Sequence, residues 1–165
     1  MPAELTVQQE GLQSLSRALK QEADGKLLRR DLSKRLRQAL DPIKEDARSN
    51  LMGIASAGLS RGTPLRQTVA QQMKAQARLS GRSAGAALRV RRKGMPRGFF
   101  NAPKALNNPK GWRHPVMGNR EVWVEQVAQP TEWFDRAARE GRDLARDKAL
   151  EAMEDTAARI VRNVK

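Results

Sequence analysis

The sequence contains no cysteine, which excludes disulfide bonds, thiolate metal sites and cysteine nucleophiles. The absence of cysteine also fits a reducing compartment. No apolar run approaches the ~18 residues of a membrane-spanning helix, so we expect no membrane partner. The first ten residues, MPAELTVQQE, lack the basic start and apolar stretch of a secretory signal, and we expect none.

Large apolar side chains are also scarce. Leu, Ile, Val and Phe together make up 32 of the 165 residues, or about 19%. Below roughly 20%, a chain with a high net charge approaches the composition of disordered proteins. The long helical patterns described below argue against full disorder. We therefore expect the chain to complete its core by packing against copies of itself or against a partner.

Acidic residues are missing from the middle of the chain. The net charge is +14, yet residues 1–60 and 121–165 together are neutral. Residues 61–120 hold 14 Lys and Arg and no Asp or Glu. A block of one sign repels itself unless an anionic surface lies nearby, so nucleic acid and an acidic protein are candidate partners. The alternative is a solvated basic loop that serves solubility.

The length fits a single domain, 1–165, in which three parts differ in composition. Residues 1–60 are helical in pattern, 61–120 form a basic strand-and-loop region, and 121–165 read as a strand followed by a helix. This order predicts an α+β fold. We expect N-terminal helices, a small antiparallel sheet with a long basic loop, and a long C-terminal helix.

Apolar residues at steps of three and four predict the N-terminal helices. A first helix is expected over about 8–23. A longer stripe follows at Leu28, Leu32, Leu36, Leu40, Ile43, Ala47 and Leu51. Pro42 either kinks this helix or stands in the first turn of a new one that Asp41 caps. After a loop, Thr63 is expected to cap a short helix that carries Leu65, Val69 and Met73.

Two segments alternate with a period of two and predict strands. In Ala86–Val90, Leu88 and Val90 face one side, and Arg89 faces the other with Arg91 beyond. In Glu121–Gln126, Val122 and Val124 face away from Trp123. The residues between them, 93–119, are rich in Gly, Pro and Asn and are expected to form a long loop.

The last helix is expected to open at Pro130 and Thr131, with Thr131 as its cap. We expect Trp133 or Phe134 to be buried where this helix meets the sheet. Its buried stripe is predicted to contain Ala138, Gly141, Ala145, Ala149, Met153, Thr156, Ile160 and Val164. These small residues favour close packing against a neighbouring helix.

Residue patterns of catalysis are absent from the sequence. His114 is the only histidine, so a two-His metal site cannot form, and no Gly-rich phosphate loop is present. A Ser-His-Asp triad would need His114, with Glu121 or Glu125 as the nearest acids, but no nucleophile-elbow pattern accompanies them. We read His114 as a loop residue packed near Trp112. The sequence therefore predicts a protein that is not an enzyme and that has no cofactor or metal.

A dense basic cluster is the candidate binding site. It consists of Arg89, Arg91, Arg92, Lys93 and Arg97, and Phe99 and Phe100 follow directly. Basic groups neutralise phosphates, and aromatic rings can stack on bases. The cluster could equally face an acidic partner, and the aromatic residues could anchor a loop. No known nucleic-acid-binding motif is present.

One stretch resembles a known family. Gly111 to Glu140, GWRHPVMGNREVWVEQVAQPTEWFDRAARE, resembles the C-terminal half of head–tail joining or tail-completion (neck) proteins of long-tailed bacteriophages, which are related to the minor tail protein Z of lambda. Leu88 to Gly94, LRVRRKG, looks like the strand that precedes this half. The matching residues are His114, Pro115, Val116, Gly118, Asn119, Trp123, Gln126, Pro130, Trp133, Phe134 and Ala137. Together the two stretches cover about a third of the chain.

The resemblance implies a structural virion protein that assembles with itself into a ring, with six copies, at the head–tail junction. Its implied partners are the neighbouring connector and tail-tube proteins, and DNA that crosses the channel is a further candidate. The implied locations are the virion and, during assembly, the cytoplasm of the bacterial host. The composition leaves open an alternative, a basic protein that binds nucleic acid without sequence preference.

Overall fold

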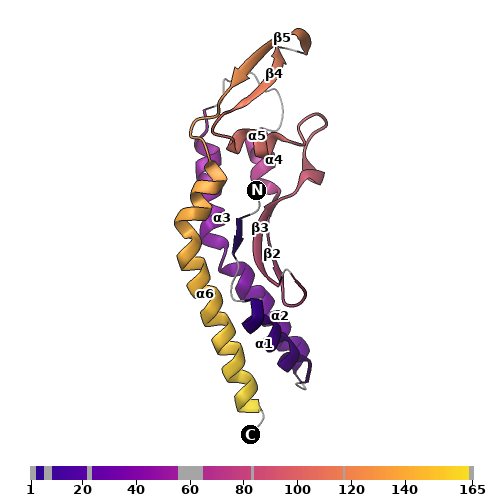
Figure 1. Ribbon diagram of the computed structural model, residues 1–165, viewed down its shortest axis with the longest axis vertical. Helices are drawn as coiled ribbons and strands as arrows, with labels where there is room; N and C mark the ends of the chain where they lie inside the picture. Colours follow the sequence, from indigo (N-terminus) through magenta and orange to yellow (C-terminus); the bar gives the residue numbers. More distant parts are fainter. Residues whose placement is uncertain are drawn as a thin grey trace. The chain divides into compact units, whose positions relative to one another are not determined.

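A computed structural model describes residues 3–5, 9–21, 24–55, 65–82, 84–116 and 118–163. The elements appear in chain order in Figure 1. They are β1 (Ala3–Leu5), α1 (Gln9–Gln21), α2 (Gly25–Gln38), α3 (Asp41–Gly53), α4 (Leu65–Gln71), β2 (Met73–Arg78), β3 (Gly85–Val90), the 3-10 helix η1 (Arg92–Gly94), α5 (Ala102–Asn107), β4 (Trp112–Val116), β5 (Asn119–Gln126) and α6 (Trp133–Asn163). The predicted α+β class, with N-terminal helices and a long C-terminal helix, is confirmed.

The chain divides into two compact units, which we describe one at a time. Unit 1 comprises residues 45–74 and 90–139, and unit 2 comprises residues 2–44, 75–89 and 140–165. The chain passes between them inside α3, β2, β3 and α6. That residues 1–165 form a single domain stays a prediction.

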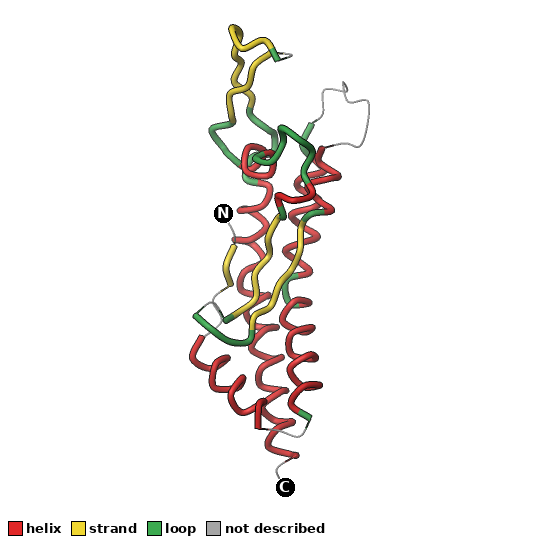
Figure 2. Tube along the Cα trace, turned by 90° about the vertical axis from the view of Figure 1, so that its right-hand side faces the viewer, coloured by secondary structure: helices red, strands yellow, loops and turns green. Residues whose placement is uncertain are grey.

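Unit 2 buries the apolar stripes of its helices together with alternate residues of β3 in a small sheet. The predicted residues of α2 and the start of α3 are buried, from Leu28 to Ile43. The sheet has the order β1-β3-β2, visible in Figure 2, and Leu88 of β3 is buried. On α6, Gly141, Ala145, Ala149 and Thr156 of the predicted stripe are buried.

Gly141 gives α6 a close approach to the start of α3. A Cβ built on this glycine would lie 2.5 Å from Cγ1 of Ile43. Real Cβ atoms do not come so close to a side-chain carbon, so the contact depends on the absence of a side chain. The prediction that small residues serve close helix packing is confirmed at this position.

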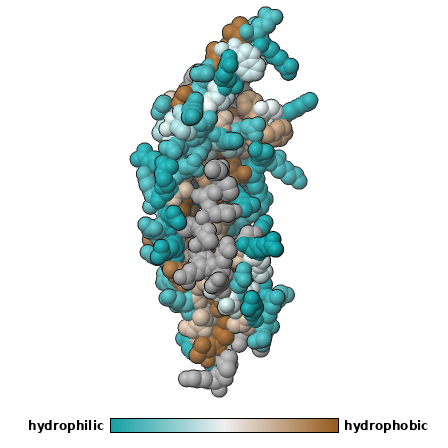
Figure 3. Space-filling view, viewed as in Figure 1, coloured by the Kyte–Doolittle hydropathy of each residue, from teal (hydrophilic) through white to brown (hydrophobic). Residues whose placement is uncertain are grey.

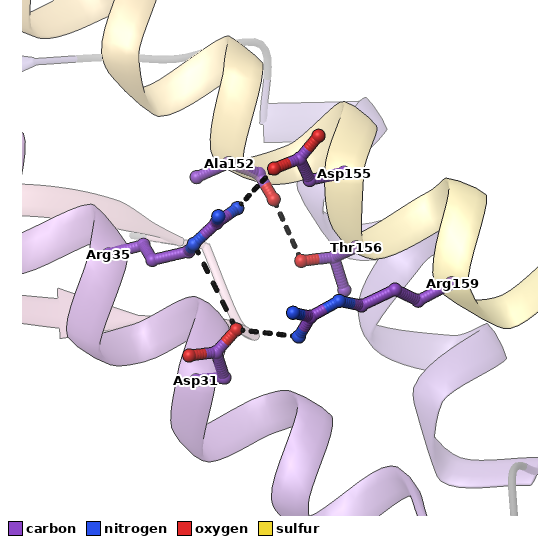
Figure 4. A network of polar contacts seen from close by, with 6 residues as sticks. All are labelled: Asp31, Arg35, Ala152, Asp155, Thr156 and Arg159. Carbon is purple, nitrogen blue, oxygen red and sulfur yellow. Dashed lines mark hydrogen bonds and ion pairs between the residues drawn. The ribbon is translucent and has the colours of Figure 1, made fainter.

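Polar contacts join α2 to α6 at the edge of the same core (Figure 4). Arg35 Nη1 donates to Asp155 Oδ2 at 2.7 Å, and Arg159 Nη1 donates to Asp31 Oδ2 at 3.0 Å. The hydrogen bond from Arg35, with the positive charges of Arg35 and Arg159, lowers the pKa of Asp155 below its ordinary value of 3.8. The two ion pairs fix the register of the helices but are partly exposed, so each contributes little to stability.

Unit 1 is built around the end of α3, the short helices α4 and α5, and the first turns of α6. Its buried apolar residues are Ala47, Leu51, Ile54, Val69, Met73, Met95, Ala102, Leu106, Ala128, Trp133, Phe134 and Ala137. Arg66 binds the backbone where α3 ends: its Nη1 donates to the carbonyl oxygens of Met52, in the last turn, and of Ile54, just after the helix. A β4–β5 hairpin extends away from α4 and α5 (Figure 1).

Several sequence predictions are settled by these elements. Pro42 lies in the first turn of a separate helix, α3, which begins at Asp41 rather than after it. The two predicted strands exist, but they lie in different sheets: β3 pairs with β1, and β5 pairs with β4. The expected long loop, 93–119, is wrong, because it contains the end of η1 and all of α5 and β4. The predicted cap Thr63 lies outside the described residues.

Candidate functional site

The β4–β5 hairpin carries most residues of the phage-like motif. Its antiparallel register pairs Trp112 with Gln126, His114 with Val124, and Pro115 with Trp123. A register shift between Pro115 and Val116 precedes the turn at Gly118, which has a φ of +84°. The motif residue Gly118 therefore lies in the turn, since only glycine adopts such a φ readily, and Asn119 begins β5 directly after it.

His114 holds the two strands together. Its Nε2 lies 3.0 Å from Oε1 of Gln126, and its ring centroid lies 6.3 Å from that of Trp112. His114 was expected near Trp112 but in a loop, whereas it belongs to β4. The motif residues His114 and Gln126 are thus direct partners, which is a structural role.

Gly111 sets the base of the hairpin. Its φ is +71°, and a Cβ built on it would lie 2.2 Å from the carbonyl oxygen of Gln126. Asn108 Nδ2 donates to the Gly111 carbonyl at 2.5 Å, and the Gly111 N–H donates to the Asn108 carbonyl at 2.9 Å. The turn from Asn108 to Gly111 therefore leads the chain directly into β4 against the end of β5.

The second strand of the hairpin, β5, is exposed on both of its faces, whereas most residues of β4 are half-buried. Every residue of β5 is exposed, although a strand in a folded domain ordinarily buries one face. The exposed apolar side chains are Val122, Trp123, Val124 and the following Val127, with 49%, 47%, 39% and 44% of their surface accessible. Hydrophobic surface is visible over β4 and β5 at the top of Figure 3. A two-stranded hairpin alone is marginally stable in water, and the exposed apolar side chains of β5 make this hairpin a candidate contact surface.

The ring of Trp123 is held in place although it is exposed. Its Nε1 donates to the carbonyl oxygen of Arg120 at 2.7 Å. Beside it, Asn119 Oδ1 accepts the backbone N–H of Glu121 at 2.9 Å. Because the polar edge of the indole is already satisfied, its apolar face is preorganised for contact.

Two further motif residues, Trp133 and Phe134, are buried at the start of α6. The prediction of burial is confirmed, but they lie beside α3 and α5 rather than at a sheet. Asn50 Nδ2 of α3 donates to the Trp133 carbonyl at 3.3 Å, and the Phe134 N–H donates to Oδ1 of Asn107 at 2.9 Å. These two residues anchor the helix and do not form a binding surface.

The cap of α6 comes from Asn107 of α5. Asn107 Oδ1 accepts the N–H groups of Phe134 and Asp135, and its Nδ2 donates to Asp135 Oδ2 at 2.8 Å. The prediction that Thr131 caps this helix is wrong, because α6 begins only at Trp133. Glu132 precedes it with a φ of +54°.

The predicted basic cluster is spread over the end of β3, η1 and the turn after it. Arg91, Arg92, Lys93 and Arg97 are exposed, whereas Arg89 is half-buried. Leu88 and Val90 were expected to be buried together on one face of β3, with Arg89 on the solvent side. Leu88 is buried, but Val90 is only half-buried, as Arg89 is. Phe99 and Phe100 are exposed by 52% and 49%. The exposed residues from Arg91 to Phe100 form what we call the basic segment.

No protein-family model, curated protein or solved structure matches the chain. Over the residues that the structure describes, no group of three His, Asp or Glu side chains could hold a metal ion. In the same residues, no helix is both long and apolar enough to cross a membrane.

The sequence analysis did not predict β4. It also did not predict the role of Asn108 in the turn before β4 or the role of Asn107 as the cap of α6. The alternation of Trp112, His114 and Val116 after the turn residues Asn108-Pro109-Lys110-Gly111 was an available signal for β4. No local signal points to Asn107, because its partners are 27 and 28 residues away.

Proposed function

We propose that the chain is a structural, non-enzymatic subunit that assembles with copies of itself into a ring, with six copies, at the head–tail junction of a long-tailed bacteriophage. In this proposal it contacts the connector and tail-tube proteins, acts in the virion and assembles in the host cytoplasm. DNA passing through the channel is a further contact of the basic segment.

The observation that carries this proposal is the β4–β5 hairpin, whose strand β5 is exposed along its whole length. It holds most of the residues by which the chain resembles the neck proteins, and it exposes apolar side chains along β5. Exposed apolar surface of this kind is typical of a protein–protein interaction site. The low share of large apolar residues in the sequence supports the same proposal.

The proposal is tested in two steps. The native mass of the purified full-length chain is measured over a range of concentrations, where we expect closed oligomers to replace the monomer. In a phage that encodes the chain, we expect loss of its gene to leave filled heads and free tails, and expression of the chain from a plasmid to restore joining. Normal particles without the gene would refute the proposed function.

A second candidate function is unspecific nucleic-acid binding. It is favoured by four exposed cations, Arg91, Arg92, Lys93 and Arg97, placed beside the exposed rings of Phe99 and Phe100. If this segment alone contacts duplex DNA, the logarithm of the affinity should fall with the logarithm of salt concentration with a slope of about −3.6. Tight binding by the monomer with this slope would favour the second function, and a weak, slope-free interaction would exclude it.

A further inference from the structure

We propose that the hairpin of one copy docks onto the basic segment of the next copy. The contact uses the face of β5 that carries Glu121, Trp123 and Glu125. This inference rests on the proposed function and names the surfaces by which the subunits would join.

The docking face follows from the strand register. Glu121, Trp123 and Glu125 alternate along β5 and so share one face, with Pro115 and Arg113 opposite them on β4. The central group is the fixed, exposed indole of Trp123. Two carboxylates and one guanidinium surround it, so the face has a net charge of −1.

Arg113 lies opposite Glu125 in the strand register and offsets only part of the negative charge of this face. Among the described residues, neither Glu121 nor Glu125 takes part in an ion pair. The other acids of unit 1, Asp46 excepted, have partners: Glu45 with Arg48, Glu132 with Arg139, and Asp135 with Asn107. Because Asn107 is uncharged, four carboxylates of unit 1 have no ion pair among the described residues, Asp46, Asp135, Glu121 and Glu125, and two of these four lie together on the hairpin.

The basic segment offers the complementary chemistry. It presents four exposed cations and two exposed phenyl rings within ten residues. Arginine binds both carboxylates and the face of a tryptophan ring, and Phe rings pack against the same indole. Tryptophan and arginine are also the residue types that dominate the binding energy of protein interfaces. The two surfaces thus match in charge sign and in apolar character.

Because the two surfaces differ, each copy uses its hairpin toward one neighbour and its basic segment toward the other. Such a heterologous contact joins copies head to tail and closes into a ring when the rotation between neighbours allows it. The hairpin would gain the cover that β5 lacks in the single chain. The docking contact is therefore of the type that a ring-forming subunit needs.

Charge reversal tests the contact in the full-length chain. We compare the wild type with a hairpin variant, E121K/E125K, and a segment variant, R91E/R92E. Each variant should raise the concentration at half-assembly by about tenfold or more, because like charges would then face each other. Native mass and sedimentation give the oligomeric state, and circular dichroism verifies that each variant folds.

The decisive measurements are the combinations. The quadruple variant should assemble at a lower concentration than either double variant, since the charges at positions 121 and 125 are again opposite to those at positions 91 and 92. An equimolar mixture of the two double variants should also assemble, as alternating copies in which every contact pairs opposite charges at these four positions. A closed ring of six copies allows the two variants to alternate, because six is an even number.

Matched controls on exposed positions of α6 separate docking from net charge. D143K/D147K changes the net charge as the hairpin variant does, and R142E/R146E changes it as the segment variant does. Both controls should assemble at the wild-type concentration. Assembly lost equally in the controls would overturn the inference.

The outcomes for the two proposals differ. Two outcomes would refute the docking inference and leave the proposed ring standing. In the first, the wild type and both double variants form rings equally well. In the second, the wild type forms rings but neither combination restores assembly. If charge-dependent assembly occurs but a phage without the gene joins its heads and tails normally, the docking stands and the proposed function fails. A wild type that stays monomeric at every concentration would refute both.

Discussion

Asn107 is the residue on which the start of α6 depends. Its side chain accepts two backbone N–H groups of the first turn and donates to Asp135, and it is half-buried. In Asn107→Ala these donors lose their acceptor, and we expect the free energy of unfolding to fall by about 0.5–2 kcal/mol. Urea unfolding followed by circular dichroism measures the change.

The chain offers a matched control in Asn101, which stands at the N-cap position of α5 without a side-chain capping bond. Asn101→Ala should leave the stability nearly unchanged. Equal losses in the two variants would show that α6 does not depend on its distant cap.

Asp155 makes part of the stability of unit 2 dependent on pH. Its carboxylate accepts from Arg35 at 2.7 Å, and this lowers its pKa below the ordinary value of 3.8. A group with a lowered folded-state pKa stabilises the fold above its unfolded pKa and loses this effect as the pH falls through the folded value. Asp155→Asn should therefore be less stable than the wild type at pH 7, by a small amount, and equally stable well below pH ~3.8.

Thermal melts at pH 7, 5 and 3 follow this convergence. Asp147→Asn is the control, because Asp147 is exposed on the same helix and has no ion pair among the described residues. If the difference in melting temperature between Asp155→Asn and the wild type grew as the pH fell, the lowered pKa assigned to Asp155 would be wrong.

At the scale of elements, Gly141 decides how closely α6 approaches α3. Alanine ordinarily favours a helix over glycine by about 1 kcal/mol. Here the added Cβ would lie 2.5 Å from Ile43 Cγ1, and overpacking of this kind costs about 1–3 kcal/mol. We expect Gly141→Ala to lower the stability or leave it unchanged, and never to raise it by the helix-propensity amount.

Gly53, the last residue of α3, gives the comparison. A Cβ there would meet nothing within 4 Å, so Gly53→Ala should be neutral or stabilising. In addition, Ile43→Ala should lower the free energy of unfolding less in the Gly141→Ala background than in the wild type, because it removes the atom that clashes with the new Cβ. Additive effects of the two substitutions would argue against the close contact.

The elements were predictable to different degrees. With the exception of α5, which lies inside the expected loop, the α-helices followed from apolar residues at steps of three and four, since burial of one stripe depends on spacing alone. Strand pairing did not follow, because a period of two tells which side chains share a face but not which strand lies alongside. Leu88 was thus placed correctly in a strand, but its neighbours β1 and β2 were not predicted, and neither was β4, the partner of β5.

At the scale of the whole chain, the composition predicted that the protein has an exposed contact surface, but it did not predict which element carries that surface. The acid-free block 61–120 and the scarcity of large apolar residues predicted a need for partners. The exposure of both faces of β5 could not be predicted, because its alternation is typical of a half-buried strand. Exposure depends on what covers a strand, and that information is spread over the whole sequence.

The three tryptophans differ in their surroundings, and this gives the chain an intrinsic optical probe. Trp133 is buried, Trp112 is half-buried and Trp123 is exposed, while the chain has no tyrosine. Upon assembly, the fluorescence emission should move to shorter wavelength and become less accessible to acrylamide, because the indole of Trp123 leaves water. The same titration with Trp123→Phe should show no such shift, and a shift that persists would place the desolvated ring elsewhere.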